Sequence, residues 1–336
     1  MILVTGGTGL VGSYLLYKLT QSESKVRAIY RSKTKIEKTK HIFSYFSDDV
    51  ESQFSKIEWV EAHLNNIPLL EEAFIDIEYV YHCAAFISFD EKDYHELRQT
   101  NIFGTANIVN LCISNNIKKL CYVSSIATIG HNDNGNLITE ETHWNPEEDH
   151  NVYAITKYGA EMEIWRGTQE GIDAVVVNPG IILGGGFWHS GSGSLFKRVY
   201  KGLSHYTTGV TGYIDVMDVV NSMVLLMNKP IKNERYIIVS ESLSFKDFTV
   251  KTANALNVKA PTKEASKNLL QIAWRLDWLR QKLTGKRRRL TKKMTETVSR
   301  KSYYSNKKLV DTLELQLKPI DVSIHETSQQ LLEVYS

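Results

Sequence analysis

Residues 1–12 read MILVTGGTGLVG, and this stretch decides how the fold is interpreted. Residues 2–4 are a short apolar run, which predicts the buried first strand of a parallel sheet. Glycines follow at positions 6, 9 and 12, and residues 10–20 have the apolar spacing of a helix. The stretch therefore predicts a strand, a tight glycine turn and a helix, in that order.

This turn has the features of a dinucleotide-binding loop. Gly6 permits the tight turn, Gly9 lets the backbone approach a pyrophosphate, and Gly12 lets the helix pack closely on the strand. The positive end of the helix dipole would then face the phosphates. An ordinary glycine-rich turn is the alternative, since the spacing is Gly-x-x-Gly-x-x-Gly. The residues predicted to contact the cofactor here are Gly6, Thr8, Gly9, Leu10, Val11 and Gly12.

The end of the second predicted strand, residues 25–30, indicates which dinucleotide is bound. NAD sites usually place an acidic side chain there to hold the ribose hydroxyls. Here Tyr30 takes that position, and Arg31 and Lys33 follow it. Because arginine binds a phosphate through two hydrogen bonds, we predict that Tyr30 and Arg31 contact the cofactor and that NADP(H) is favoured over NAD(H). In the alternative, Arg31 and Lys33 belong only to a solvated loop.

The chain has 336 residues, of which 42% are hydrophobic, enough for a sizeable core. Further candidate strands at residues 57–60, 79–83, 119–123 and 174–178 alternate with helical patterns, which is typical of an α/β fold with a doubly wound parallel sheet. We expect a Rossmann domain over residues 1–180 that carries the catalytic residues. Residues 181–336 are expected to form a smaller C-terminal substrate-binding lobe, part of which returns to the sheet.

The cysteines and the apolar runs indicate the compartment. Cys83, Cys112 and Cys121 lie in apolar surroundings without metal-ligand spacing, which predicts buried free thiols and no metal site. No stretch approaches the length of a membrane span, and the first strand leaves no room for a targeting segment. We therefore expect a cytoplasmic protein.

Two regions beyond residue 180 have more than one interpretation. Residues 184–186 and 190–194 are rich in glycine and serine and enclose Phe187 and Trp188, which predicts either a flexible loop that covers the substrate or a plain linker. Phe187, Trp188 and Phe196 are expected in the substrate region.

The second region is basic: residues 251–310 contain 17 lysines and arginines against three acids. Over residues 270–293, one interpretation is a basic amphipathic helix on an anionic membrane surface or an acidic substrate. In the interpretation we prefer, the charges are solvated and the apolar side chains pack into the lobe. No recognised motif accompanies the charge, so nucleic-acid binding is not expected. The apolar residues are Trp274, Leu276, Trp278, Leu279 and Leu283, and the densest basic run is Lys286, Arg287, Arg288 and Arg289.

The candidate catalytic residues follow the strand at residues 119–123. This strand brings Ser124 and Ser125 to its carboxyl end, the edge where ligands bind in open α/β sheets. Tyr153 and Lys157 are four residues apart in a helical stretch and therefore share one face. An ammonium beside a phenol would lower the phenol's pKa from its usual value near 10. We predict that Tyr153 exchanges a proton with a substrate oxygen as hydride moves, that Ser125 holds this oxygen, and that Lys157 also reaches the nicotinamide ribose. A chance surface pair is the alternative.

Together these motifs resemble those of the extended short-chain dehydrogenase/reductases, in the NAD-dependent epimerase/dehydratase family. The resemblance is strongest to the branch that contains dihydroflavonol 4-reductase, cinnamoyl-CoA reductase and 3β-hydroxysteroid dehydrogenase. The matching segments span nearly the whole chain: residues 5–12, 82–85, 101–105, 122–126, the pair at 153 and 157, 178–180, 212–219 and 300–305.

The resemblance implies roles for individual residues. Ser125, Tyr153 and Lys157 would be catalytic, and Asn101 would support the active-site backbone or a proton-relay water. Ser124 and Thr128 are alternatives to Ser125 as the catalytic hydroxyl. The residues expected to lie against the cofactor are Ala84, Ala85, Ser124, Tyr153, Lys157 and Pro179.

Two positions depart from the family pattern. His63 stands where the family often has an aspartate that contacts the adenine. Ile126 and Ala127 stand where sugar-nucleotide dehydratases have an Asp-Glu pair, which disfavours loss of water.

We expect an NADP(H)-dependent oxidoreductase that interconverts a carbonyl and a hydroxyl on a largely apolar small molecule. The alternatives are a sugar-nucleotide epimerase that retains NAD and a non-catalytic dinucleotide-binding sensor or scaffold. A homodimer is left open, because helices beside the central strands pair subunits in many relatives.

Overall fold

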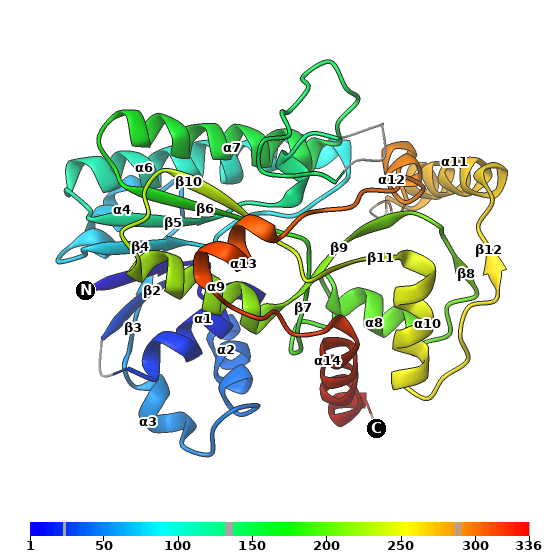
Figure 1. Ribbon diagram of the computed structural model, residues 1–336, viewed down its shortest axis with the longest axis horizontal. Helices are drawn as coiled ribbons and strands as arrows, with labels where there is room; N and C mark the ends of the chain where they lie inside the picture. The colour runs from blue at the N-terminus through cyan, green and yellow to red at the C-terminus, as the bar shows by residue number, and fades with distance from the viewer. Residues whose placement is uncertain (23–24, 132–136, 286–287, 289, 336) are drawn as a thin grey trace.

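The computed structural model describes residues 1–22, 25–131, 137–285, 288 and 290–335. Its central sheet has seven parallel strands in the order β10-β6-β5-β4-β1-β2-β3 (Figure 1). The six strands predicted from the sequence are all present, each within one residue of its predicted bounds. The strands are β1 (Ile2–Thr5), β2 (Val26–Tyr30), β3 (Ile57–Glu61), β4 (Tyr79–His82), β5 (Lys119–Val123), β6 (Ala174–Pro179) and β10 (Glu234–Ile238).

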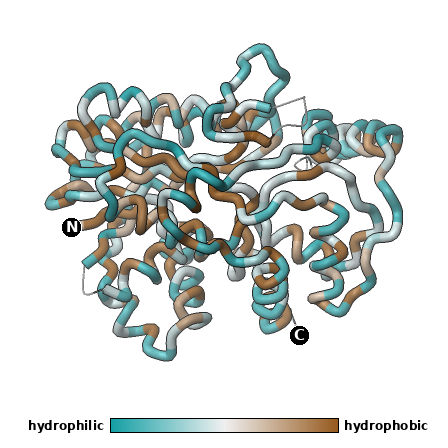
Figure 2. The backbone as a smooth tube through the Cα atoms, in the orientation of Figure 1, coloured by the Kyte–Doolittle hydropathy of each residue, from teal (hydrophilic) through white to brown (hydrophobic). Residues whose placement is uncertain are grey.

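Helices cover both faces of this sheet, which explains why its central strands are continuous apolar runs. In β6, Ala174 and the three valines that follow it have no exposed surface. Figure 2 shows the hydrophobic colour concentrated along the central strands. One face packs against α1 (Leu10–Thr20) and α9 (Val216–Asn228), and the other against α4 (Ile67–Phe74), α6 (Gly104–Ser114) and α7 (Val152–Gln169).

The crossovers between these strands contain short helices. Those after β2 are η1 (Lys33–Lys35), α2 (Ile36–Phe43) and α3 (Val50–Phe54). Those after β4 are η2 (Glu91–Asp93), α5 (Tyr94–Leu97) and the π-helical segment η3 (Arg98–Phe103), and η4 (Ile126–Thr128) follows β5.

The strand order reverses between β1 and β4, and this position determines where a ligand can bind. The chain runs outward from β1 to β3 and then returns to place β4 on the other side of β1. A crevice outside the carboxyl ends of the strands forms at such a switch point. Gly6 leaves β1 there with φ +69°, and a Cβ on it would lie 2.7 Å from the Ala84 nitrogen after β4. Glycine is therefore required at position 6 by conformation and by space.

The second part of the chain builds a lobe beside the sheet and also returns to it through β10. A three-stranded sheet in the order β11-β9-β7 supports the lobe, with α8, α10 and α14 packed on it (Figure 1). Whether the lobe binds the substrate stays a prediction. Its elements are β7 (Ile181–Leu183), α8 (Gly193–Tyr200), β8 (His205–Tyr206), β9 (Val210–Asp215), β11 (Glu241–Ser244), α10 (Phe245–Ala255), β12 (Lys263–Glu264), α11 (Lys267–Thr284), α12 (Lys292–Thr297), α13 (Lys307–Leu313) and α14 (Ile320–Tyr335).

The glycine-rich segment after β7 is close-packed, so the prediction of a flexible stretch at residues 184–186 is wrong. A Cβ on Gly184 would lie 2.6 Å from the Val216 side chain, and one on Gly186 would collide with Ile42. The serines and glycines at residues 190–194 lead directly into α8. Trp188 and Phe196 are buried in the core of the lobe, so their predicted place in the substrate region is also wrong. Both errors arise because glycine pattern and hydrophobicity do not distinguish a loop over a ligand from one that packs against neighbouring helices.

Within the basic region, the described part of residues 270–293 lies in α11, in the segment after it and in the start of α12, at the outer end of the lobe (Figure 1). The preferred expectation that the apolar side chains of this region pack inward is wrong for four of the five, since Leu276, Trp278, Leu279 and Leu283 are exposed. Lys286, Arg287 and Arg289 lie outside the described residues. Across the described residues, none of the helices combines the length and apolar character needed to cross a membrane.

Candidate functional site

The glycine loop between β1 and α1 fits the pyrophosphate of a dinucleotide. Gly9 is the N-cap of α1 in an extended conformation, and among the described residues no side chain caps this helix end. A Cβ on Gly9 would meet only the Gly6 carbonyl oxygen, at 3.4 Å, whereas one on Gly12 would collide with that same oxygen. Gly12 thus lets the helix pack on the loop, while the side of Gly9 stays open for a ligand. The helix N-terminus there favours an anion.

The carboxyl ends of β2 and β3 carry the residues expected at the adenosine end of the cofactor. Tyr30 closes β2, and its ring lies 6.3 Å from that of Trp59 on β3. Arg31 is exposed. Burial lowers the pKa of the His63 imidazole, and the charge of Arg31 lowers it further. A cation stands beside the β2 strand end, where NAD sites usually have an acid.

Asn101 fixes the backbone that leaves β4. Its Oδ1 accepts a hydrogen bond from the Phe86 amide at 2.7 Å, and its Nδ2 donates to the Phe86 carbonyl at 3.0 Å. Nδ2 also lies 3.2 Å from Thr156 Oγ1 on α7. Asn101 belongs to η3, a π-helical segment of the kind often found at functional sites. Of its two expected roles, these contacts match support of the backbone. Ala84 and Ala85 lie in the segment that follows β4. The Ala84 amide donates a hydrogen bond to Thr5 Oγ1 at 3.2 Å, and Ala85 is partly buried.

Ser125 and Tyr153 are brought together at the carboxyl edge of the sheet. Burial raises the pKa of the half-buried Tyr153 phenol to about 12, although the neighbouring Ser125 hydroxyl opposes this rise. The direction is opposite to the lowering that we predicted. Phe89 lies beside the pair, with its ring centre 5.5 Å from that of Tyr153.

Lys157 lies one helical turn after Tyr153 on α7, and its side chain is directed into the protein. Its Nζ donates to Tyr122 Oη at 2.6 Å and to the Val123 carbonyl at 2.8 Å. Burial lowers the pKa of Lys157 to about 7, although the carboxylate of Glu161 opposes this. The prediction that Lys157 lowers the pKa of Tyr153 is therefore wrong for this structure: the amine is oriented toward β5, and removal from water dominates at both groups.

A buried carboxylate that the sequence analysis did not identify organises the base of this site. Glu161 has no exposed surface, and its Oε2 accepts hydrogen bonds from Ser124 Oγ at 2.5 Å and Thr128 Oγ1 at 2.7 Å. Asn178 Nδ2 adds a third at 3.0 Å, and Arg235 lies 3.5 Å from Oε1. The hydroxyls of Ser124 and Thr128 thus face Glu161, whereas Ser125 faces Tyr153. The signal was available, since residues 153, 157 and 161 follow one another at helical spacing.

Substituting Glu161 by glutamine is expected to lower the free energy of unfolding by about 3–5 kcal/mol. The amide nitrogen of glutamine would have to face donors that now share two carboxylate oxygens, and Arg235 would lose its counter-ion. Urea unfolding measures the change. Glu163→Gln on the same helix is the matched control, since Glu163 forms a surface ion pair with Arg166 and should cost less than about 1 kcal/mol. Equal costs in the two variants would contradict the organising role of Glu161.

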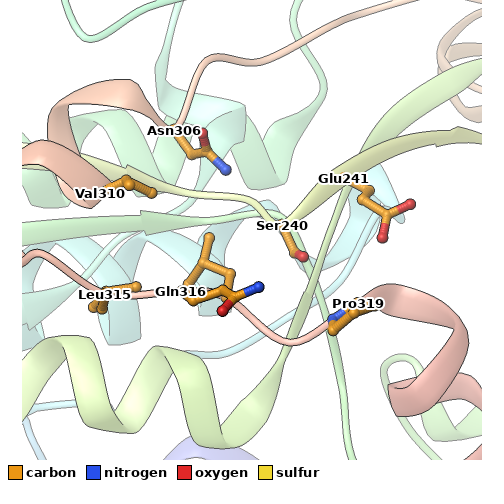
Figure 3. A pocket seen from close by; sticks show the side chains of 8 residues that line it. Ser240, Glu241, Asn306, Val310, Leu315, Gln316 and Pro319 are labelled. Carbon is orange, nitrogen blue, oxygen red and sulfur yellow. The ribbon is translucent and has the colours of Figure 1, made fainter.

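A surface pocket at the junction of the sheet and the lobe includes none of the predicted site residues (Figure 3). Ser240 Oγ donates to the Lys318 carbonyl at 2.7 Å, and Glu241 Oε1 accepts from the Ile320 amide at 2.9 Å. These polar groups join the β10-β11 connection to the segment before α14. The pocket is thus part of the contact between two chain segments.

Within the described ranges, one cluster has side chains of the types that bind metal ions. It consists of His131, Glu148 and His150, whose potential ligand atoms all lie within 4.8 Å of one another. His150 Nε2 lies 2.7 Å from the Asn145 carbonyl oxygen, and Arg300 lies 3.9 Å from Glu148. These contacts hold residues 145–150 together and join them to the segment that follows α12, which accounts for the closeness of the three side chains. The expectation of no metal site stays a prediction.

Comparison with known proteins identifies the family. The family model described as NAD_binding_4, male sterility protein, matches residues 4–233. A putative dihydroflavonol 4-reductase from Synechocystis sp. is 27% identical over 266 residues, which cover 77% of this chain and 73% of the relative. Sterol demethylase protein B from Methylococcus capsulatus is 28% identical over 71% of this chain and 69% of its own length.

Solved structures share the fold over the whole chain. The UDP-glucose 4-epimerase of Thermotoga maritima superposes with a TM-score of 0.78 and 20% identity, covering 100% of this chain and 99% of the epimerase. The matched family segment covers more than half of the chain and includes the glycine loop, Tyr153 and Lys157. The chain therefore belongs to the NAD_binding_4 (male sterility protein) family, within the extended short-chain dehydrogenase/reductases, and is an NAD(P)-dependent reductase or dehydrogenase of that type.

Proposed function

We propose that this chain is an NADP(H)-dependent reductase that converts a carbonyl to a hydroxyl on a largely apolar small molecule, with Tyr153 as the proton donor. The observation that carries the proposal is the Ser125–Tyr153 pair beside Phe89, at the sheet edge that also holds the glycine loop. A bound nicotinamide would supply the hydride. The chain's own residues then have to orient the carbonyl and deliver one proton.

The raised pKa of Tyr153 favours this direction of the reaction. With a pKa of about 12, the phenol is protonated near neutral pH and can act as an acid without prior activation. An alkoxide that forms as hydride arrives is a stronger base than a phenolate, so the proton moves to it. The Ser125 hydroxyl neighbours the phenol and would hold the same oxygen. Lys157, with a pKa of about 7, can gain or lose a proton under the same conditions.

Support for an apolar substrate comes from the mouth of the site. Phe89 is exposed next to Tyr153, and Ile87 in the same loop is also exposed. Two curated relatives carry the printed names dihydroflavonol 4-reductase and sterol demethylase protein B, which refer to largely apolar ring systems. Trp188 and Phe196 are buried in the core of the lobe and therefore do not support an apolar substrate.

The NADP(H) preference is proposed from Tyr30 and Arg31 at the end of β2. Arg31→Ala is expected to raise the dissociation constant for NADPH by about 10- to 100-fold and to leave that for NADH nearly unchanged, because only NADPH carries the 2′-phosphate. Fluorescence titration with each nucleotide measures both constants. Lys38→Ala on α2 is the control for general surface charge. Tighter binding of NADH than NADPH by the unaltered protein would contradict the preference.

The proposed activity is tested by following NADPH oxidation over a panel of aryl, alicyclic and aliphatic ketones. We expect turnover with apolar ketones and consumption of one NADPH for each alcohol formed. If the purified protein retained NAD and interconverted sugar nucleotides with no net oxidation, the epimerase alternative would replace the proposal. If it bound NADPH but turned over no carbonyl, the sensor alternative would replace it.

A further inference from the structure

Helix α11 exposes a continuous apolar stripe. Its members are spaced three or four residues apart, so they lie on one face of the helix. Each is between 40% and 77% exposed. The helix lies at the outer end of the lobe (Figure 1) and beyond the matched residues 4–233. The stripe consists of Leu269, Ile272, Leu276, Leu279 and Leu283. An exposed apolar face of this length is typical of an interaction surface.

The other side of α11 is anchored, so the orientation of the stripe is fixed. Leu270 and Gln281 are buried, and Gln281 Nε2 donates to Asp90 Oδ2 at 3.3 Å. Asp277 pairs with Arg280 at 2.7 Å and accepts a hydrogen bond from the Leu290 amide at 3.0 Å. Turning the stripe inward would break these contacts.

Cations border the stripe. Arg275 lies 4.7 Å from the Trp274 ring and Lys282 lies 4.2 Å from the Trp278 ring, and both charged side chains are exposed. Asp277, which is paired and only 11% exposed, is the sole acid in the sequence of α11. The face that α11 presents to solvent is therefore apolar in the centre and positive at its edge. Long cationic side chains at such an edge can reach polar groups while their stems stay on the apolar surface.

We propose that α11 docks on an anionic membrane surface, with the stripe in the boundary between headgroups and acyl chains. Helices that lie in the membrane interface combine these two features, an apolar face and a basic border. Charge complementarity selects the occupant: a second copy of this helix would bring like charges together, whereas an anionic lipid surface attracts them.

Docking would also place the active site near the lipid. The Gln281–Asp90 hydrogen bond joins α11 to the loop that carries Phe89 beside Tyr153. An apolar substrate dissolved in the bilayer could then enter without crossing water. This consequence rests on the proposed function, whereas the docking itself does not.

Vesicle flotation with the full chain, without cofactor or substrate, tests the docking. We expect binding to vesicles of phosphatidylcholine with phosphatidylglycerol and little binding to phosphatidylcholine alone. Leu276→Ser with Leu283→Ser should weaken the binding at least about tenfold, because both apolar side chains lose their burial. Ile75→Ser with Val334→Ser is the matched control, since both residues are exposed apolar positions on other elements.

Charge variants test the same surface independently of the stripe. Arg275→Gln with Lys282→Gln should weaken binding at least about tenfold, and added salt should reproduce the loss. Lys201→Gln with Lys229→Gln is the control, since both lysines are exposed on other elements. Equal binding to neutral and anionic vesicles, or unchanged binding by either α11 variant, would overturn the proposal. So would a dimer that dissociates in the leucine variant while the unaltered protein ignores vesicles.

Discussion

Replacing Tyr153 by phenylalanine is expected to lower kcat for carbonyl reduction at least about 10²-fold, with the dissociation constant for NADPH nearly unchanged. The variant loses the hydroxyl that delivers the proton, but it keeps the ring that packs beside Phe89 at 5.5 Å. Steady-state kinetics with an active ketone gives kcat, and a fluorescence titration gives the affinity for NADPH. Loss of kcat without loss of cofactor binding is expected of a group that acts on the reacting oxygen.

Tyr158→Phe supplies the control for this variant. Tyr158 is on the same helix, but it stacks on Trp144 at 4.5 Å and is not among the predicted site residues. Its loss should leave kcat within a small factor of the unaltered protein. If Tyr153→Phe retained most of its activity, a proton source other than the phenol would be required and the proposed mechanism would fail.

Replacing Lys157 by methionine is expected to change both catalysis and the pH dependence of stability. Burial lowers the pKa of Lys157 from 10.5 to about 7 in the folded protein. Between these values the unfolded chain binds the proton and the folded chain does not, so this group makes folding more favourable as pH rises from 7 to 10.5. Below pH 7 both states are protonated and the penalty for the buried charge is fully present. Methionine has similar length and does not titrate.

The measurement is the difference in unfolding free energy between the unaltered protein and Lys157→Met across this pH range. The difference should shift in favour of the unaltered protein by about 4 kcal/mol between pH 7 and pH 10. At the same time kcat should fall at least about tenfold, since the hydrogen bonds from Nζ to Tyr122 and to the Val123 carbonyl, which fix the end of β5 at the site, are lost. Lys118→Met is the control: Lys118 is exposed and paired with Glu78, which raises its pKa, so the difference should stay nearly flat up to pH 9. A flat difference for Lys157→Met would show that its amine is not buried in this way.

Much of the fold could be predicted because burial on both faces leaves a strong pattern in the sequence. In β6 the consecutive β-branched valines favour a strand covered on both sides, and the glycines at positions 6 and 12 are required by close backbone approach. The pairing of Tyr153 with Ser125 followed from a strand end and a helix that meet at one sheet edge. Such features depend on local pattern and on general rules for parallel sheets.

The remaining features depend on which groups the tertiary structure brings together. The direction of the Tyr153 pKa could not be predicted, because it depends on how far the phenol is removed from water and on the orientation of Lys157 toward Tyr122. Glu161 follows Lys157 at helical spacing, yet only its hydroxyl and amide partners show that it organises the site. The exposure of the α11 stripe depends on the anchoring of the opposite helix face, which the sequence pattern does not specify.

The most direct test of the account is a crystal structure with NADP(H) and an unreactive ketone analogue bound. The account predicts that Tyr153 Oη and Ser125 Oγ both lie within about 2.6–3.2 Å of the ketone oxygen, with the nicotinamide ring facing the carbonyl carbon. A structure in which the Tyr153 hydroxyl points away from the bound nicotinamide would contradict the central claim that this phenol delivers the proton.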